Sequence, residues 1–179
     1  MAYKVLAICG SIRKESANLH LINAIAALAK DTLDVELYED LGMLPHFDPD
    51  CDEQHTPLIV AALRKKIEMA DGVLVCTPEY VFTLPGSFKN AIEWCVATTV
   101  FSQKPVALIT ASGLGEKAHE ALQLVMKTIE AKFDEHTQLH IRGVRSKVDK
   151  QGVITDNNTL VALKALTASF IVNIAQAHT

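Results

Sequence analysis

Three short segments of the chain carry residue types that bind charged or aromatic small molecules. The first, residues 10–18, reads GSIRKESAN. Its side chains suited to an anion are Ser11, Arg13, Ser16 and Asn18. Hydroxyl and amide groups donate neutral hydrogen bonds, a guanidinium donates charged ones, and free backbone N–H groups at the start of a helix attract an anion. This segment therefore predicts a loop that holds a phosphate group.

The glycine content of this loop indicates which kind of phosphate it would hold. A P-loop needs GxxxxGK[ST] and a dinucleotide-binding loop needs GxGxxG, whereas this loop contains only Gly10. A terminal monophosphate held from several sides is therefore favoured over a pyrophosphate lying along the helix. A purely structural alternative stays open, in which Ser16 caps the next helix and the other residues form a solvated turn.

The second segment, residues 77–86 (TPEYVFTLPG), is unusually apolar for a loop. Surface loops are normally polar, so Val81, Phe82 and Leu84 are expected to cover a ring system or a partner subunit. A proline near each end restricts the backbone, and the backbone groups between them could hold the polar edge of a heterocycle. The alternative, a loop packed on the protein's own core, stays open.

The third segment, residues 110–116 (TASGLGE), combines small residues with a serine hydroxyl. Gly113 and Gly115 permit a ligand to approach the backbone closely, and Ser112 adds a hydrogen-bonding group. Together with the other two segments, it predicts a pocket for a flat heteroaromatic ring that carries a monophosphate tail.

The hydropathy pattern predicts the elements that would position these segments. Short apolar runs predict strands at 3–9, 34–38, 72–76 and 105–110 and, most weakly, at 136–141. Helical spacing of apolar residues predicts helices over 18–29, over 58–70, from about 87 onward, over 118–133 and over 158–177. Five strands alternating with five helices indicate an α/β fold in one domain over residues 1–179.

We expect this fold to be a flavodoxin-like, doubly wound, five-stranded parallel sheet of order 2-1-3-4-5 with helices on both faces. In that order the first and third strands are neighbours, so the first two segments flank one crevice at the carboxyl edge of the sheet, where ligands bind. The third segment follows the next strand along the same edge. The topology therefore predicts that all three segments contribute to one site.

Composition and charge exclude several classes of function. The chain has 179 residues, of which 49% are hydrophobic, and 17 Lys+Arg against 21 Asp+Glu give a net charge of −4 without a long basic run. Binding of nucleic acid through phosphate neutralisation is therefore not expected. No apolar run exceeds about six residues, whereas a membrane span needs about twenty. The first apolar segment, 3–9, is too short for a signal peptide, so we expect a cytoplasmic protein.

Cysteine and histidine residues indicate no further chemistry. Cys9, Cys51, Cys76 and Cys95 form no CxxC pair, so free thiols, mostly buried, are expected rather than a disulfide or a zinc site. Residues 46–55 (HFDPDCDEQH) look like a metal-binding cluster, but their irregular spacing favours a solvated acidic loop. No histidine pairs with a nucleophile in a way that would indicate a Cys/His hydrolase.

Two motifs together make the chain similar to a known family. They are Gly10-Ser11-x-Arg13-x-x-Ser16-x-Asn18 and Pro78-Glu79-Tyr80-x-x-x-x-Pro85-Gly86-x-x-Lys89-Asn90-Ala91-Ile92-Glu93-Trp94. In combination they resemble the NADPH-dependent FMN reductase family, which includes quinone, chromate and azo-dye reductases. The resemblance extends from the first strand to the last helix. It implies non-covalent FMN, NADPH or NADH as electron donor, and a homodimer or homotetramer.

The resemblance also implies roles for individual residues. The phosphate of FMN would contact Ser11, Arg13, Ser16 and Asn18, the isoalloxazine edge would lie along Pro78, Glu79, Tyr80 and Val81, and Ser112, Gly113 and Gly115 would close the other side. No obligatory catalytic side chain is expected, because FMN supplies the redox chemistry. Tyr80 and Phe82 would shape the face that nicotinamide and acceptor share. Trp94 and Cys95, on the helix after the second segment, could belong to the core or contact a partner subunit, and the resemblance favours the subunit contact.

The sequence departs from the family pattern at one informative place. Many relatives that reduce quinones or chromate have Asn-Tyr after Pro-Glu-Tyr, where this chain has Val81 and Phe82. The apolar pair removes side-chain hydrogen bonds near the ring, so the acceptor stays open among a quinone, a free flavin, an azo compound and a metal oxyanion. A flavodoxin-type electron carrier without a substrate site of its own, and a flavin-free relative, remain alternatives.

Overall fold

A five-stranded parallel sheet forms the centre of the protein. The computed structural model describes residues 2–51, 55–149 and 151–178. The strands are β1 (Tyr3–Cys9), β2 (Leu33–Leu37), β3 (Gly72–Thr77), β4 (Val106–Ser112) and β5 (Gln138–Arg142), in the order β2-β1-β3-β4-β5. All four strand pairs are parallel. The predicted flavodoxin-like topology is confirmed.

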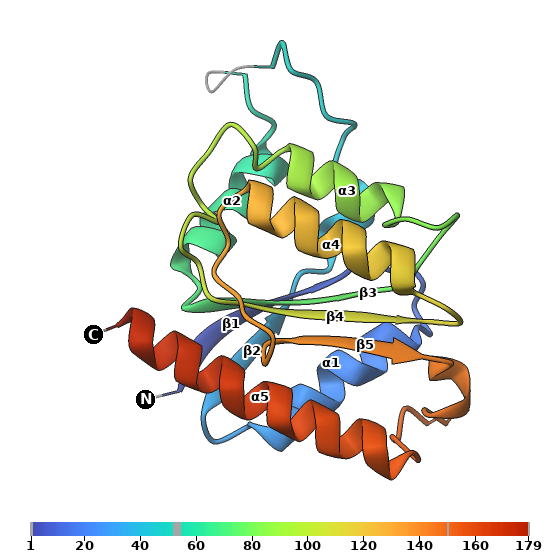
Figure 1. The fold of residues 1–179 in the computed structure, drawn as a ribbon. Helices are drawn as coiled ribbons and strands as arrows, with labels where there is room; N and C mark the ends of the chain where they lie inside the picture. Colours follow the sequence, from blue (N-terminus) through green and yellow to red (C-terminus); the bar gives the residue numbers. More distant parts are fainter. Residues whose placement is uncertain (1, 52–54, 150, 179) are drawn as a thin grey trace.

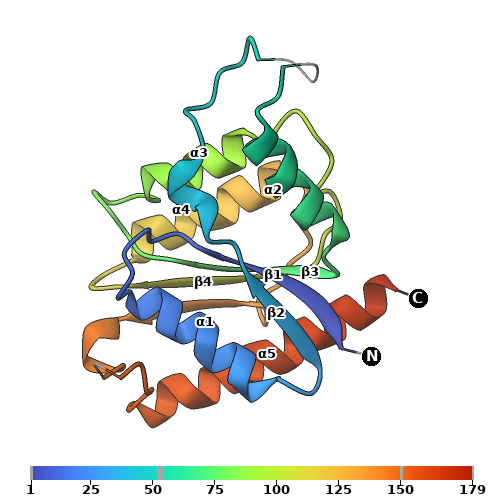
Figure 2. The same cartoon turned by 180° about the vertical axis from the view of Figure 1, so that it is seen from behind.

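Helices cover both faces of this sheet. They are α1 (Ala17–Leu28), α2 (Leu58–Met69), α3 (Gly86–Glu93), α4 (Glu116–Thr128) and α5 (Asn157–Ala177), with short 3-10 helices η1 (Asp40–Met43) and η2 (Val144–Ser146). Helices α1 and α5 lie on one face, and α2, α3 and α4 lie on the other (Figures 1 and 2). Both chain termini lie at the amino edge of the sheet, away from the loops that follow β1, β3 and β4 (Figure 1).

The burial of β3 explains why an uninterrupted apolar run forms the middle of the sheet. All six residues of β3 are buried, and side chains alternate between the two faces of a strand. Val73 and Val75 pack in the core beneath α2, α3 and α4, whereas Leu74 and Cys76 pack in the core beneath α1 and α5. The sheet therefore separates two hydrophobic cores, each closed by its own set of helices.

One predicted helix is shorter than its apolar spacing indicated. The prediction of 118–133 is wrong at its end, because α4 stops at Thr128. Glu130 adopts a left-handed φ of 60°, which turns the chain away from the helix axis. Ile129 and Phe133 lie in the connection to β5 and still pack against the core. The apolar spacing therefore predicted their contact with the core correctly, but not that they are helical.

The residues that follow α3 belong to the core of the chain. Trp94 and Cys95 are both buried, and the Trp94 Nε1–H donates to the Pro45 carbonyl at 2.8 Å. The ring of Trp94 also meets Phe47 edge-on, with centroids 5.2 Å apart. The prediction that Trp94 and Cys95 meet a partner subunit is therefore wrong. Their neighbour Val96 is exposed.

The four cysteines are free thiols, as predicted. Cys9, Cys76 and Cys95 are buried, and Cys51 is partly exposed. Burial raises the pKa of the Cys9 thiol and raises that of Cys76 well above its ordinary value. These thiols are therefore poor nucleophiles at neutral pH.

Helix α5 is the one helix in the described part of the chain that is long and apolar enough to span a membrane. Its apolar stripe is used within the fold, because Leu163, Phe170 and Ile174 are fully buried. The helix packs against α1, β4 and β5. Its hydropathy is therefore accounted for by packing on the sheet.

Candidate functional site

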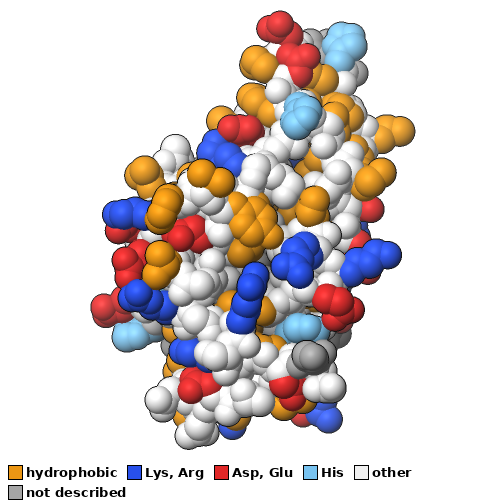
Figure 3. Space-filling model, turned by 90° about the vertical axis from the view of Figure 1, so that its right-hand side faces the viewer, with side chains coloured by type: hydrophobic (Ala, Val, Ile, Leu, Met, Phe, Trp, Pro, Cys, Tyr) orange, Lys and Arg blue, Asp and Glu red, His pale blue; other side chains and the backbone are white. Residues whose placement is uncertain are grey.

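The three segments that the sequence singled out meet at the carboxyl edge of the sheet. A cavity of about 680 Å³ lies between them, within the range of about 300–1,000 Å³ typical of cofactor sites. Its lining residues are Ser11, Arg13, Glu15, Ser16, Ala17, Asn18, Pro78, Glu79, Tyr80, Ala111, Ser112, Gly113, Val144 and Arg145. All predicted site residues line it except Val81 and Gly115. Figure 3 shows this edge, where basic and hydrophobic side chains lie side by side.

The first loop can pass over the end of β3 because it begins with glycine. The Gly10 N–H donates to the Cys76 carbonyl at 2.8 Å. A Cβ atom on Gly10 would lie 2.1 Å from the Thr77 hydroxyl oxygen, which is far inside van der Waals contact. The close approach of loop and strand therefore requires a residue without a side chain here.

Two buried serine hydroxyls face the cavity from this loop. The Ser16 oxygen accepts from the Asn18 N–H at 3.3 Å and caps α1, and the Ser11 oxygen accepts from the Arg13 N–H at 3.4 Å. In both contacts the serine oxygen acts as an acceptor, which leaves the Ser11 hydroxyl hydrogen available to an anion, whereas the Ser16 hydroxyl is also hydrogen-bonded to the Cys9 side chain. Capping uses only the oxygen of Ser16 and so does not by itself prevent a contact with an anion.

Asn18 connects the first loop to the third. Its side-chain N–H donates to the Ala111 carbonyl at 3.2 Å, and its side-chain oxygen accepts from the Cys76 thiol at 3.3 Å. The amide thus spans the end of β3 and fixes two walls of the cavity relative to each other. Its predicted contact with a phosphate stays a prediction, because part of its hydrogen-bonding capacity is used inside the protein.

Two guanidinium groups line the cavity. Arg13 comes from the first loop, and Arg145 comes from η2, which follows β5. Among the residues that the structure describes, neither guanidinium forms an ion pair or a side-chain hydrogen bond. Sequence reasoning missed Arg145, although the strand order places the end of β5 at this same edge. Glu15 and Glu79 also line the cavity, but the two guanidinium groups can donate charged hydrogen bonds to a phosphate.

The side chain of Glu79 is directed to α4. Its carboxylate accepts from the Lys117 and Ala118 N–H groups, both at 3.1 Å. These are free N–H groups in the first turn of α4, where a negative charge is stabilised by the helix dipole. Glu79 therefore attaches the second loop to α4. Pro78 and Tyr80 on either side of it complete the wall that this loop presents to the cavity.

Gly115 shapes the third loop from outside the cavity. It caps α4 with a left-handed φ of 92°, and a Cβ atom there would lie 2.8 Å from His140 Nε2. The His140 Nε2–H donates to the Leu114 carbonyl at 2.6 Å. His140 also stacks on His119, whose Nδ1 is hydrogen-bonded to the Thr110 hydroxyl at 3.0 Å. Neither imidazole lines the cavity, so the pair supports the loop from behind.

The middle of the second loop, from Tyr80 to Thr83, forms a tight hairpin. Tyr80 and Thr83 exchange two backbone hydrogen bonds, of 3.0 and 3.1 Å. The two residues between them, Val81 and Phe82, have φ values of 51° and 57° and are 92% and 69% exposed. Leu84, in contrast, is buried, so the prediction that it covers an external group is wrong. The apolar hairpin tip projects beside the cavity and does not line it.

The residues present fit FMN. Hydroxyl donors, guanidinium groups and the N-terminus of α1 all line the cavity, which suits the phosphate. Pro78 and Gly113 line it too, and a Cβ atom on Gly113 would meet nothing within 4 Å. That open backbone leaves room for a flat ring. In the described part of the chain no three His, Cys, Asp or Glu residues gather to hold a metal ion, and Asp52, Glu53 and Gln54 of the acidic loop lie outside it.

Comparison with known proteins adds independent support. The family model for NADPH-dependent FMN reductases matches residues 3–141. An NAD(P)H:quinone oxidoreductase of Solanum tuberosum is 34% identical over 172 residues, covering 91% of this chain and 88% of that protein. A 2-hydroxy-1,4-benzoquinone reductase of Burkholderia sp is 32% identical and covers 89% of both chains.

A solved structure shows the same fold. The flavoenzyme NAD(P)H:(acceptor) oxidoreductase FerB of Paracoccus denitrificans superposes with a TM-score of 0.79 and 26% identity, over 98% of each chain. An archaeal flavodoxin superposes with a TM-score of 0.66 but only 11% identity, which shows the fold alone. The relatives thus favour a reductase over an electron carrier.

Proposed function

This chain belongs to the NADPH-dependent FMN reductase family, and we propose that it is an FMN-dependent enzyme that oxidises NAD(P)H and reduces a small acceptor, foremost a quinone. The observation that carries the proposal is that Ser11, Arg13, Ser16 and Arg145, which can donate hydrogen bonds to an anion, line the carboxyl-edge cavity together. The balanced reaction is NAD(P)H + H⁺ + quinone → NAD(P)⁺ + hydroquinone. Quinones are the acceptors that the names of several relatives state.

The chain's own residues bind and orient the reactants. Ser11, Ser16, Arg13 and Arg145 hold the phosphate by neutral and charged hydrogen bonds. The walls at Pro78–Tyr80 and Ser112–Gly113 hold the isoalloxazine ring. Bound FMN supplies the redox chemistry, by accepting a hydride and passing electrons on. No side chain is assigned as an acid or base, because the redox chemistry belongs to the cofactor.

We further infer that residues 1–179 form one reductase domain in which donor and acceptor use the same cleft in turn. The elements from β1 to α5 occupy nearly all of these residues and form the carboxyl-edge cavity that donor and acceptor would share. We propose a homodimer or homotetramer in the cytoplasm, without nucleic acid or membrane as partner. Light scattering of the purified protein measures the oligomeric state.

A visible spectrum followed by anaerobic titration tests the function. The purified protein mixed with FMN should retain a flavin absorbance after gel filtration, and NADPH or NADH should bleach it. Loss of all flavin on the column contradicts FMN binding. Retained flavin that neither nucleotide bleaches, with no turnover in the presence of a quinone, instead indicates an electron carrier that needs a partner reductase.

A further inference from the structure

The hairpin tip between Tyr80 and Thr83 holds two apolar residues in a backbone conformation that they disfavour. Left-handed φ values cost free energy for any residue with a Cβ atom, and most for β-branched ones such as Val81. Asparagine or glycine is the usual residue at such positions. The local fold alone therefore does not explain valine here.

The other non-glycine residues with a left-handed φ in the described chain are polar. They are Gln103 and Glu130, whose backbones are hydrogen-bonded to each other at 2.9 Å near the amino edge of the sheet. Val81 and Phe82 differ in being apolar, highly exposed and placed beside the cofactor cavity. Strained residues concentrate at functional sites, so a role at this site is indicated.

The surroundings of the hairpin tip show which kind of molecule it suits. Each of the three loops exposes a large apolar side chain at this edge: Ile12 in the first, Val81 and Phe82 in the second, and Leu114 in the third. The turn Tyr80–Thr83 contains no charged residue. Exposed apolar side chains therefore lie at the same edge as the charged residues that line the cavity (Figure 3).

We propose that Val81 and Phe82 determine the acceptor: the hairpin tip selects apolar quinones with fused or alkylated rings over charged acceptors. This inference rests on the proposed function. An apolar quinone would leave water on contact with the two side chains, which favours its binding, whereas an anionic acceptor would lose hydration without gaining a partner. The hydride from NAD(P)H supplies both electrons and one proton, and a second proton from solvent completes the conversion of the quinone to the hydroquinone as written above.

Two acceptors that differ in one substituent test the selectivity. Menadione carries a methyl group where 1,4-naphthoquinone-2-sulfonate carries an anionic sulfonate. The measured quantity is the ratio of kcat/KM for menadione to kcat/KM for the sulfonate. Val81→Asn should lower this ratio by about tenfold, which corresponds to removing the side chain of one valine from contact with the ligand. Val81→Gly and Phe82→Asn should change it in the same direction.

The same variant has a second readout that a simple loss of structure would not produce. Asparagine tolerates the left-handed conformation, so Val81→Asn should raise the Tm by about 2 to 4 °C while it lowers the ratio. Gln103→Asn is the matched control, because it makes the same kind of change at the opposite edge of the sheet. It should raise the Tm by less, since glutamine is unbranched, and leave the ratio unchanged.

The outcomes separate this inference from the proposed function. An unchanged ratio in Val81→Asn, with FMN bound and reduced by NADPH, overturns the inference and leaves the reductase intact. Failure of the wild-type protein to bind FMN or oxidise NADPH overturns both. Dissociation of an oligomer in Val81→Asn, seen by light scattering, would make the hairpin tip a subunit contact and also overturn the inference.

Discussion

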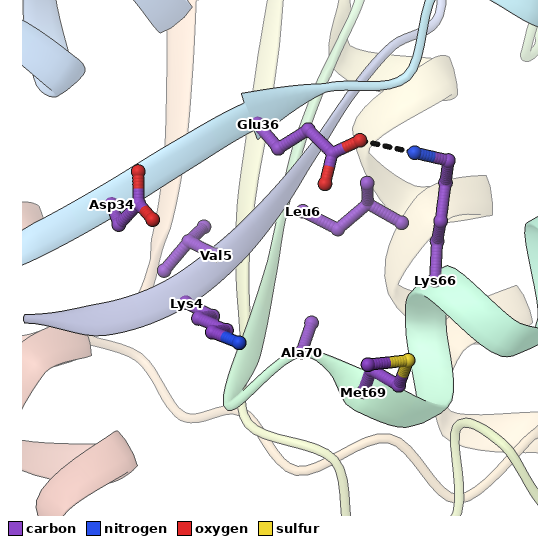
Figure 4. A pocket seen from close by; sticks show the side chains of 8 residues that line it. All are labelled: Lys4, Val5, Leu6, Asp34, Glu36, Lys66, Met69 and Ala70. Atoms are coloured by element: carbon purple, nitrogen blue, oxygen red, sulfur yellow. Dashed lines mark hydrogen bonds and ion pairs between the residues drawn. The ribbon is translucent and has the colours of Figure 1, made fainter.

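Two cavities lie at opposite edges of the same sheet and differ in how their charges are used. The amino-edge cavity, of about 370 Å³, lies between β1, β2 and the end of α2. It contains Lys4, Lys66, Asp34 and Glu36, and the last of these pairs with Lys66 (Figure 4). The Lys66 ammonium is therefore already paired within the protein. At the carboxyl edge, Arg13 and Arg145 find no ion-pair partner among the described residues.

The difference follows from the direction of the strands. In a parallel sheet the carboxyl ends of the strands lead into loops that end at helix N-termini, where backbone N–H groups are free and the dipole is positive. The amino ends receive helix C-termini, as α2 shows. A cavity at the carboxyl edge therefore starts with unused donors, and the unpaired arginines add to them. A binding site therefore differs from other surface cavities in having hydrogen-bond donors that are not used within the protein. The volume of a cavity does not show this difference.

Closing the carboxyl-edge cavity with a single methyl group should have the largest effect. In Gly10→Ala the new Cβ would lie 2.1 Å from the Thr77 hydroxyl oxygen, so the first loop must shift. We expect a loss of about 1 to 3 kcal/mol in the free energy of unfolding, with FMN affinity reduced more than tenfold. Urea denaturation and FMN titration measure the two effects.

Gly86→Ala is the control for this substitution, because a Cβ at Gly86 would meet nothing within 4 Å. It should retain both stability and FMN binding. If Gly10→Ala binds FMN as the wild-type protein does, the close passage of the loop over β3 does not shape the site.

Removing one unpaired charge should affect binding next most strongly. Arg145→Met keeps a long side chain but loses the guanidinium, and a charged hydrogen bond contributes about 1.5 to 3 kcal/mol. The Kd of FMN should therefore rise about 10- to 100-fold, as measured by flavin fluorescence. Lys66→Met, which removes a cation at the other edge, should leave the Kd unchanged. Equal effects of the two variants would contradict the distinction between the cavities.

Arg145 also shows where sequence reasoning reaches its limit. The strand order, the three loops and most of the lining residues could be predicted, because apolar periodicity and glycine positions act locally. Arg145 follows a weak strand and belongs to no motif, so only the assembled sheet brings it to the cavity. The predicted partner contact of Trp94 failed for a related reason, because its burial depends on Pro45 and Phe47, which are distant in sequence.

Glu79 illustrates a second limit, since the sequence identified the residue and not its contact. It stands in the second motif, but its carboxylate is directed to the N-terminus of α4. Such a contact depends on how two loops pack. The motif therefore predicted that Glu79 belongs to the site. The structure shows that its carboxylate holds the second loop against α4.

Weakening the attachment of Glu79 to the N-terminus of α4 should have a moderate effect on the free energy of unfolding. Glu79→Gln keeps an oxygen acceptor but removes the negative charge, so we expect a loss of about 0.5 to 1 kcal/mol in the free energy of unfolding. The Kd of FMN should rise by less than in Arg145→Met. Glu120→Gln, on the same helix but paired only with exposed Lys117, is the control and should change neither quantity. A stability equal to wild type in Glu79→Gln would show that the charge is not used.

The smallest expected effect is a pH dependence at the back of the third loop. Burial, and then the neighbouring His140, lower the pKa of His119 below its ordinary value. The unfolded chain therefore binds a proton at this residue at a higher pH than the folded protein does, and folding stability must fall as the pH drops through the unfolded pKa of about 6.5.

His119→Asn should lose that part of the acid sensitivity, measured as the Tm difference between pH 7.5 and pH 5.5. His136→Asn, which removes an exposed imidazole, should keep it. If both variants retain the wild-type difference, protonation of His119 behind the third loop does not affect the stability of the carboxyl edge.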